Sequence, residues 1–185
     1  MKRTILMAFL LCACQPESQQ SLAPVALTAE AVGHFCQMNL LEHPGPKAQI
    51  HLEGLPGAPL FFSQVSDAIA YMRLPEQSHP ILAVWVNDMG ASGVTWDDPG
   101  ADNWVDAATA HFVVGSASQG GMGAPEVVPF AQIDAALAFV AQNGGSVMSL
   151  DAIPDEAVIA PLSDAGGDDA EYTRRLRALS QKTGG

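Results

Sequence analysis

Apolar residues recur every three or four positions in two separate stretches of the chain. They are Phe62, Val65, Ile69 and Met72 in the first stretch, and Phe130, Ile133, Leu137 and Val140 in the second. This spacing places each set on one face of an α-helix. The sequence therefore predicts two amphipathic helices, over residues 62–72 and 130–140.

The two predicted helices also resemble each other, with Phe, Gln, a β-branched residue, Ala and an aromatic residue in the same order. Runs rich in β-branched and aromatic residues, typical of strands, surround both helices in one order. These runs are residues 48–53, 59–62 and 81–87 around the first helix, and 110–115, 126–130 and 146–150 around the second. Chance similarity of two amphipathic helices is the alternative explanation, and the matching strand order argues against it.

This order predicts an α+β fold with two similar ββαβ modules in one compact body. We expect the first module to span residues 27–98 and the second residues 99–155. Residues 88–102, which are rich in Gly, Asp and Pro, form the expected connection. After the second module the pattern fades, and we expect a flexible acidic tail over residues 156–185.

The start of the chain has the pattern of an export signal. Lys2 and Arg3 precede a short apolar run that ends in Leu11-Cys12-Ala13-Cys14. This run is too short to span a bilayer, and its end resembles a bacterial lipobox. The expected signal peptide is residues 1–13, with lipidation of Cys14 and a tether over residues 14–26. The alternative is an ordinary signal peptide in which Cys14 is incidental.

The formal net charge is -12, and it becomes -14 once Lys2 and Arg3 leave with the signal peptide. An acidic chain of this kind argues against nucleic-acid binding, because phosphate neutralisation needs clustered Lys and Arg. Lipid chains on Cys14 would anchor the protein to a membrane without a transmembrane helix.

Cys36 is the cysteine that remains for the folded body, because Cys12 leaves with the signal and Cys14 is expected to carry lipid. Three interpretations are open: a buried structural thiol, a nucleophile served by His34, and a metal ligand. The third is favoured by Met38, because a thiolate and a thioether two residues apart form a soft donor set of the kind that selects Cu(I).

Two further methionines lie next to glycines. Met122 is part of Gly120-Gly121-Met122-Gly123, and Met89 precedes Gly90. Glycines allow a loop to fold closely over another group, so both methionines are candidate ligands, although either could instead cap the edge of a core. The five histidines have no zinc-site spacing. His51 or His111, on predicted strands, could point inward and complete a site.

Several motifs in order resemble the NosL family of accessory lipoproteins of nitrous oxide reductase. The resemblance covers roughly residues 27–150, with a lipobox in the expected place. The motifs are His34-Phe-Cys-Gln-Met-Asn-Leu40, Phe61-Phe-Ser63, Val86-Asn-Asp88, Trp104-Val-Asp-Ala107, Phe112-Val-Val-Gly-Ser116 and Gly121-Met-Gly-Ala-Pro-Glu-Val127.

The resemblance implies a Cu(I)-binding metallochaperone without enzymatic activity, anchored by lipid on the periplasmic side of a bacterial membrane. It implies a role in supplying copper for the catalytic copper-sulfide centre of nitrous oxide reductase. The implied partners are a periplasmic repeat protein and an ABC transporter. The family fold is described as paired ββαβ modules similar to those of an organomercurial lyase.

Family Cu(I) ligation by cysteine, methionine and possibly histidine maps onto Cys36, Met38 and Met122. The usual family form is Cys-Gly-Met, and here Gln37 replaces the glycine, which puts Met38 in doubt as a simultaneous ligand. Two alternatives remain. An organomercurial-lyase-like thiol enzyme would use Cys36 as nucleophile or proton donor, although the cooperating cysteines are absent. A non-metal-binding assembly lipoprotein would need neither Cys36 nor Met122.

Overall fold

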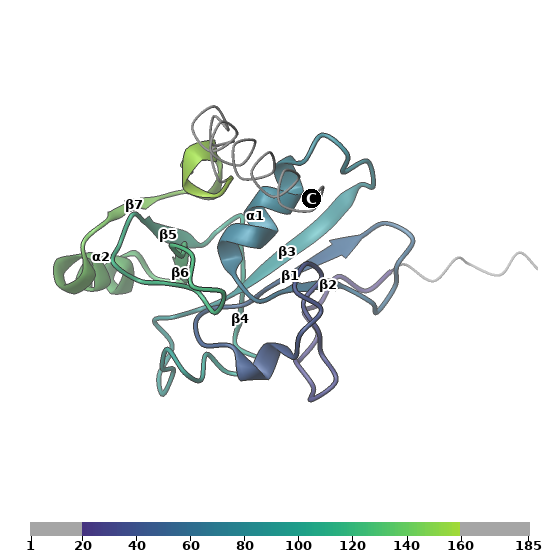
Figure 1. Cartoon of the computed structure of the whole chain (residues 1–185), viewed down its shortest axis with the longest axis horizontal. Helices are drawn as coiled ribbons and strands as arrows, with labels where there is room; N and C mark the ends of the chain where they lie inside the picture. Colours follow the sequence, from purple (N-terminus) through teal and green to yellow (C-terminus); the bar gives the residue numbers. More distant parts are fainter. Residues whose placement is uncertain (1–19, 160–185) are drawn as a thin grey trace, which may run out of the picture.

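Two antiparallel sheets, each carrying one α-helix, organise the part of the chain that the computed structural model describes, residues 20–159 (Figure 1). The strands are β1 (Ala48–Leu52), β2 (Leu60–Phe62), β3 (Ile81–Asn87), β4 (Trp104–Asp106), β5 (His111–Val114), β6 (Val128–Phe130) and β7 (Ser146–Met148). The helices are α1 (Val65–Arg73) and α2 (Ile133–Asn143), with 3-10 turns η1 (Leu40–Glu42), η2 (Leu150–Ala152) and η3 (Asp155–Ala157).

The two sheets repeat one strand order, which confirms the predicted α+β fold of two ββαβ modules. The first sheet has the order β2-β1-β3-β4 and the second the order β6-β5-β7. In each module the first strand is central, the second lies on one side of it, and the strand after the helix lies on the other. All neighbouring strands pair antiparallel.

Both helices begin three residues later than the apolar pattern predicts. Phe62 ends β2, where it pairs with Ala48, and Phe130 ends β6, where it pairs with His111. Gln64 and Gln132, which precede α1 and α2, also have extended backbones. The predicted helix starts were wrong because each Phe, which continues the helical spacing, belongs to the strand ladder.

Strand β4 belongs to the first sheet. It pairs with β3 through Val86 and Val105 and through Asn87 and Trp104. The expected division at residues 98 and 99 would instead assign β4 to the second module. The connecting loop returns beside β3, and the Asn87 side chain donates to the Asn103 carbonyl at 2.8 Å, which holds the loop against the strand.

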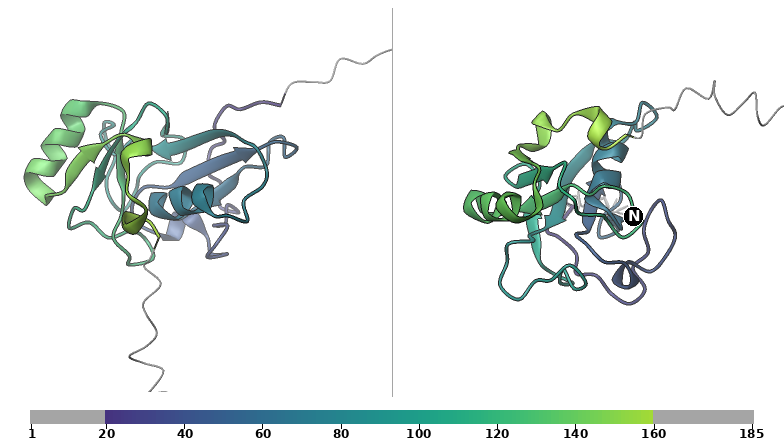
Figure 2. Two further views of the ribbon diagram at one scale, coloured as in Figure 1. Left: turned by 90° about the horizontal axis from the view of Figure 1, so that it is seen from above. Right: turned by 60° about the vertical axis from the view of Figure 1, so that its left-hand side comes forward.

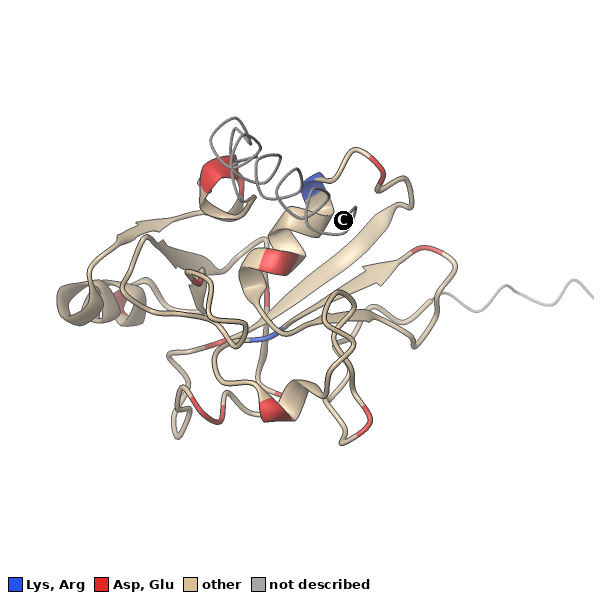
Figure 3. Cartoon of the chain, in the orientation of Figure 1, with Lys and Arg blue, Asp and Glu red and all other residues tan. Residues whose placement is uncertain are grey.

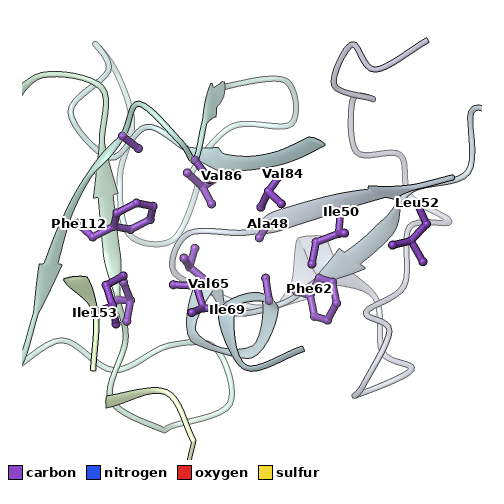
Figure 4. Close-up of a cluster of buried hydrophobic side chains, with 14 residues drawn as sticks. Ala48, Ile50, Leu52, Phe62, Val65, Ile69, Val84, Val86, Phe112 and Ile153 are labelled. Atoms are coloured by element: carbon purple, nitrogen blue, oxygen red, sulfur yellow. The ribbon is translucent and has the colours of Figure 1, made fainter. Parts of the chain in front are cut away.

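One hydrophobic core joins the two modules. Val65 and Ile69 on α1 are buried, and Figure 4 shows them beside Phe112 of β5 and Ile153 of the C-terminal segment. Among the described residues nothing covers the equivalent face of α2 in this way: Ile133 is 49% and Leu137 52% exposed. The difference arises because residues after β7 fold back beside α1 (Figure 2), while α2 rests on its own small sheet.

The ends of the described chain are bound to the body, contrary to two expectations. At the C-terminal end, Ala157 and Val158 pack against the core, and Arg73 pairs with Asp155 at 2.7 Å. Residues 157 and 158 of the expected flexible tail are therefore held against the body. At the N-terminal end, the expected tether is hydrogen bonded to the first sheet from Gln20 onward.

The predicted signal peptide, the Cys14 lipidation site and residues 160–185 of the predicted tail lie outside the described residues. Across residues 20–159, no helix combines the length and the apolar character needed to cross a membrane.

Candidate metal centre

Cys36 lies on a short loop that closes on itself before the first sheet. The Gly33 amide donates to the Met38 carbonyl at 3.0 Å, and the Gln37 amide donates to the Gly33 carbonyl at 2.9 Å. The Cys36 thiol lies so close over Gly33 that a Cβ atom there would be 2.5 Å from Sγ. The loop therefore needs glycine at position 33, and it holds a half-buried thiol above it.

Gln37 adopts the backbone conformation that glycine would favour. Its φ angle is 55°, and it is the one non-glycine residue with positive φ in the described range. Its side-chain Nε2 donates to the carbonyls of His34 at 2.7 Å and Gly33 at 3.3 Å. These bonds offset part of the cost of the left-handed conformation, so the loop keeps its form between Cys36 and Met38 despite the missing glycine.

Substitution at Gln37 should separate the strain from the hydrogen bonds. We expect Gln37→Gly to change the free energy of unfolding little, because relief of the left-handed strain, about 1–2 kcal/mol, is offset by loss of the two side-chain bonds. We expect Gln37→Ala to lower it by about 1 kcal/mol, because alanine keeps the strain and loses the side-chain bonds. Urea unfolding of the three proteins gives both values. Both variants lose the side-chain bonds, so a glycine variant no more stable than the alanine variant would contradict the strain at this position.

Met122 lies on a second tight loop, between β5 and β6. The Gly120 amide donates to the Ala124 carbonyl at 2.9 Å, and the Gly123 amide donates to the Gly120 carbonyl at 2.8 Å. A Cβ on Gly120 would lie 2.7 Å from the Gln64 side chain, and one on Gly121 would lie 2.6 Å from His43 Cβ. The glycines thus let the loop pack closely on the first module, while the Met122 side chain stays 47% exposed.

Both loops rest on the turn that joins β2 to α1. A Cβ on Gly33, directly under the Cys36 thiol, would lie 3.8 Å from the Ser63 amide nitrogen. The Met122 amide donates to Oε1 of the next residue, Gln64, at 2.7 Å. The fold therefore brings the Cys36 and Met122 loops, which come from different modules, to the N-terminal end of α1.

The other two candidate methionines have different surroundings. Met38 closes the Cys36 loop with its carbonyl, two residues from the thiol, and is 41% exposed. A second hydrophobic cluster lies between α2 and its sheet and includes the buried residue Phe130. Met89 packs against this cluster, as Phe139 does. It therefore occupies the core-edge position that the sequence left open for it.

Two histidines adjoin the loops. The His34 ring lies 5.3 Å from the Tyr71 ring and 5.7 Å from the Phe62 ring, measured between centroids. His43 lies against Gly121, and its Nε2 is buried without a hydrogen-bond partner among the described residues. The sequence alone made His34 a candidate, because it lies two residues before Cys36. No sequence signal places His43 beside Gly121.

The two histidines that the sequence favoured lie elsewhere. His51 is buried on β1, where its Nε2 lies 3.0 Å from Oε1 of Gln49. Gln49 in turn bonds the backbone of Val25, so His51 faces the N-terminal segment. Burial lowers the pKa of His51. His111 is half-buried on β5, opposite Phe130.

A buried carboxyl group supports the Met122 loop. Glu126 accepts bonds from the amides of Ser66 at 3.1 Å and Val127 at 2.9 Å through Oε1. Its Oε2 has no partner among the described residues and faces Gly120. Burial raises the pKa of Glu126 to about 8. Burial lowers the pKa of Lys47 to about 8, and the charge of Glu126 opposes this lowering.

Gln64 and Glu126 are the supporting residues that the sequence did not single out. Gln64 recurs at the matching repeat position as Gln132, which is exposed just before α2. The repeat alone therefore could not show that only the first glutamine holds a loop. In the sequence Glu126 is one acidic residue among many, and it is buried where its carboxyl group accepts from the Ser66 amide of α1.

The donor atoms at this end of α1 are soft. A thiolate from Cys36 and thioethers from Met122 and Met38 suit Cu(I), and imidazole groups of His34 and His43 lie on the adjoining segments. Within residues 20–159, no three His, Cys, Asp or Glu side chains gather closely enough to hold a metal ion. The candidate set differs from such clusters because most of its donors are sulfur atoms.

Comparisons with known proteins agree with the motifs. A protein of Achromobacter cycloclastes named copper-binding lipoprotein NosL is 59% identical over 179 residues, covering 95% of this chain and 92% of that protein. A protein of Stutzerimonas stutzeri with the same name is 33% identical over 158 residues, covering 84% and 79%.

The fold has a solved counterpart. The crystal structure of the copper chaperone NosL from Shewanella denitrificans matches with a TM-score of 0.66 at 30% identity, covering 72% of this chain and 96% of that one. The family model described as NosL matches residues 24–158. With most of its length matched in each comparison, this chain belongs to the NosL family.

Proposed function

We propose that this protein is a Cu(I)-binding metallochaperone, held on the periplasmic side of a bacterial membrane by lipid on Cys14. The observation that carries the proposal is that the Cys36 and Met122 loops both lie against the turn that joins β2 to α1. The relatives named as copper-binding lipoproteins and as a copper chaperone support it. They also support a carrier rather than an enzyme.

The chemistry is ligand exchange. A thiolate and one or two thioethers hold Cu(I) in a low-coordinate site, which leaves room for a ligand from the recipient. Met122 and Met38 are both substantially exposed, so an incoming thioether or imidazole can reach the metal while Cys36 still holds it. Copper bound to the thiolate also protects it from oxidation, because both reactions use the same sulfur.

We propose that the copper serves the catalytic copper-sulfide centre of nitrous oxide reductase. The proposed partners are a periplasmic repeat protein and an ABC transporter of the same assembly system. An acidic surface suits a basic partner: of the charged residues in the described part, only Lys47 and Arg73 are Lys or Arg, and Lys47 is buried (Figure 3).

Two measurements test this function. The mature chain carrying Cys14→Ser should bind one Cu(I) ion in competition with a chromogenic Cu(I) chelator. In a denitrifying host that lacks the protein, purified nitrous oxide reductase should lack the catalytic copper-sulfide centre, and the wild-type gene should restore it. Absence of Cu(I) binding would exclude the chaperone function, and a complete catalytic centre in the deletion strain would exclude the proposed recipient.

A further inference from the structure

The N-terminal segment is fixed to the first sheet before it reaches the first module. The Gln20 side chain donates to the Leu52 carbonyl at 2.8 Å and accepts from the Gly54 amide at 3.2 Å. Trp85 donates through Nε1 to the Leu22 carbonyl at 2.9 Å. Two bonds between Gln49 and the backbone of Val25, at 2.8 and 3.0 Å, continue this attachment. The free part of the expected tether is therefore short.

Covalent geometry limits how far the body can move from a lipid on Cys14. Five residues lie between Cys14 and the bound Gln20, and a fully extended chain over these six steps spans about 20 Å. That is less than the width of the folded body of a small domain. A tether this short fixes which end of the body lies nearest the bilayer.

The attachment point and the candidate metal centre lie at opposite ends of β1. Gln20 bonds to Leu52, the last residue of β1, and to the turn that follows. Ala48, the first residue of β1, pairs with Phe62, which leads into the turn that supports the Cys36 and Met122 loops. Four residues of strand separate these ends by about 13 Å, and α1 runs back along the same direction.

The end that carries Gln20 also exposes leucines. Residues 53–59 connect β1 to β2, and residues 74–80 connect α1 to β3; the two turns adjoin through a bond from the Glu53 amide to the Pro80 carbonyl at 2.9 Å. Leu55 and Leu74 are both exposed on them. Figure 1 shows both turns at the right-hand end, where the described chain begins. Neither turn contains Lys or Arg, and each carries one glutamate, Glu53 or Glu76. These charges would be repelled by anionic lipid, so a zwitterionic bilayer with no net charge is the lipid surface that fits the two turns.

We propose that the turns at residues 53–59 and 74–80 rest on the bilayer and that the short tether holds them there, with Cys36 and Met122 directed away from the membrane. This orientation rests on the lipidation of Cys14 given in the proposed function. It presents the copper-loaded end to partners that stand above the membrane surface, and it keeps lipid away from the exposed sulfur atoms.

Fluorescence quenching by lipid tests the orientation. The full-length lipidated protein, carrying Cys36→Ser, would be labelled at Ala58→Cys in the first turn or at Ala124→Cys in the Met122 loop; both positions are exposed. Each protein would be placed in phosphatidylcholine vesicles that contain a head-group nitroxide lipid. We expect quenching several-fold stronger at position 58 than at position 124. Inserting twenty Gly/Ser residues after Gln15 should bring the two values together, because such a linker is flexible.

The outcomes separate this inference from the proposed anchoring. If the lipidated protein fails to float with vesicles, both the anchoring and the orientation are wrong. If it floats and the two probes are quenched equally, or position 124 is quenched more, the orientation alone is wrong. If the ratio survives the insertion, the short tether does not set it. A Cys14→Ser protein, which should stay in solution, gives the baseline.

Discussion

Replacing Cys36 with serine should weaken Cu(I) binding by about 1,000-fold or more, equivalent to about 4 kcal/mol. The thiolate supplies both the negative charge and the strongest soft donor of the candidate site, and a serine hydroxyl at the same position supplies neither. The change in size is small, and the half-buried position tolerates it. The affinity of the Cys14→Ser mature chain, with and without Cys36→Ser, is measured against a chromogenic Cu(I) chelator.

The methionines should contribute less and unequally. A neutral thioether is a weaker donor than a thiolate, so Met122→Leu should weaken binding by about 10- to 100-fold, or about 1.4–2.8 kcal/mol. Met38→Leu should have an effect in the same direction, because Met38 belongs to the same closed loop as Cys36, which Gln37 holds with positive φ. X-ray absorption at the copper edge would show one sulfur scatterer fewer in each variant.

Met89→Leu is the matched control for both variants. It makes the same chemical change in the second hydrophobic cluster, so Cu(I) affinity should stay unchanged. If Met89→Leu weakens binding as much as Met122→Leu does, the metal lies elsewhere. Unchanged Cu(I) affinity in both Cys36→Ser and Met122→Leu would show that the candidate site does not bind the metal.

The fold could be predicted because each module carries its pattern in short, local segments. β3 was located to the residue, since the run from Ile81 to Asn87 is bounded by Pro80 and by a glycine-rich loop. The helix starts could not be located, because Phe62 and Phe130 satisfy the helical spacing and the strand ladder equally well. Only the pairing across the sheet decides between them.

Some residues of the candidate site could likewise be predicted from the sequence, and others could not. Cys36, Met38 and Met122 could be proposed from residue type and neighbouring glycines. Gln64 and His43 could not, because each joins the site through a contact with the Met122 loop, which is far away in the sequence. Such contacts depend on how the two modules pack.

The exposed face of α2 is a similar case. Ile133 and Leu137 repeat the pattern of Val65 and Ile69, and the sequence gives no sign that their burial differs. The difference depends on where residues 150–158 fold, beside α1. A repeat in sequence therefore predicts repeated elements, and it does not predict which copy is covered.

Stability should fall as the pH rises from about 4.5 to about 8, because of Glu126. Its pKa is raised from 4.5 to about 8, mainly by burial. Over this range the folded chain keeps a proton that the unfolded chain releases, so each added pH unit favours unfolding, by up to about 1.4 kcal/mol. Lys47 acts in the opposite sense above pH 8: its lowered pKa means that stability recovers towards pH 10.5.

Glu126→Gln isolates the first of these effects. Glutamine has the shape of the protonated acid and cannot ionise, so its amide oxygen can still accept from Ser66 and Val127. We expect the variant to be no more stable than wild type at pH 5 and more stable at pH 8, by a few kcal/mol. Urea unfolding at several pH values measures the difference, in which contributions from other titrating groups such as His51 cancel.

The loop that carries Met122 links this carboxyl group to the metal site. Gly120 packs on the unpaired Oε2 of Glu126, so ionisation would place a buried negative charge directly beneath the loop. A neutral Glu126 therefore keeps the Met122 loop in place at neutral pH. The Lys47 ammonium group offsets part of any negative charge that forms on Glu126. Equal pH dependence in wild type and Glu126→Gln would show that Glu126 is already ionised in the folded protein, and that Lys47 stabilises the carboxylate more than burial opposes it.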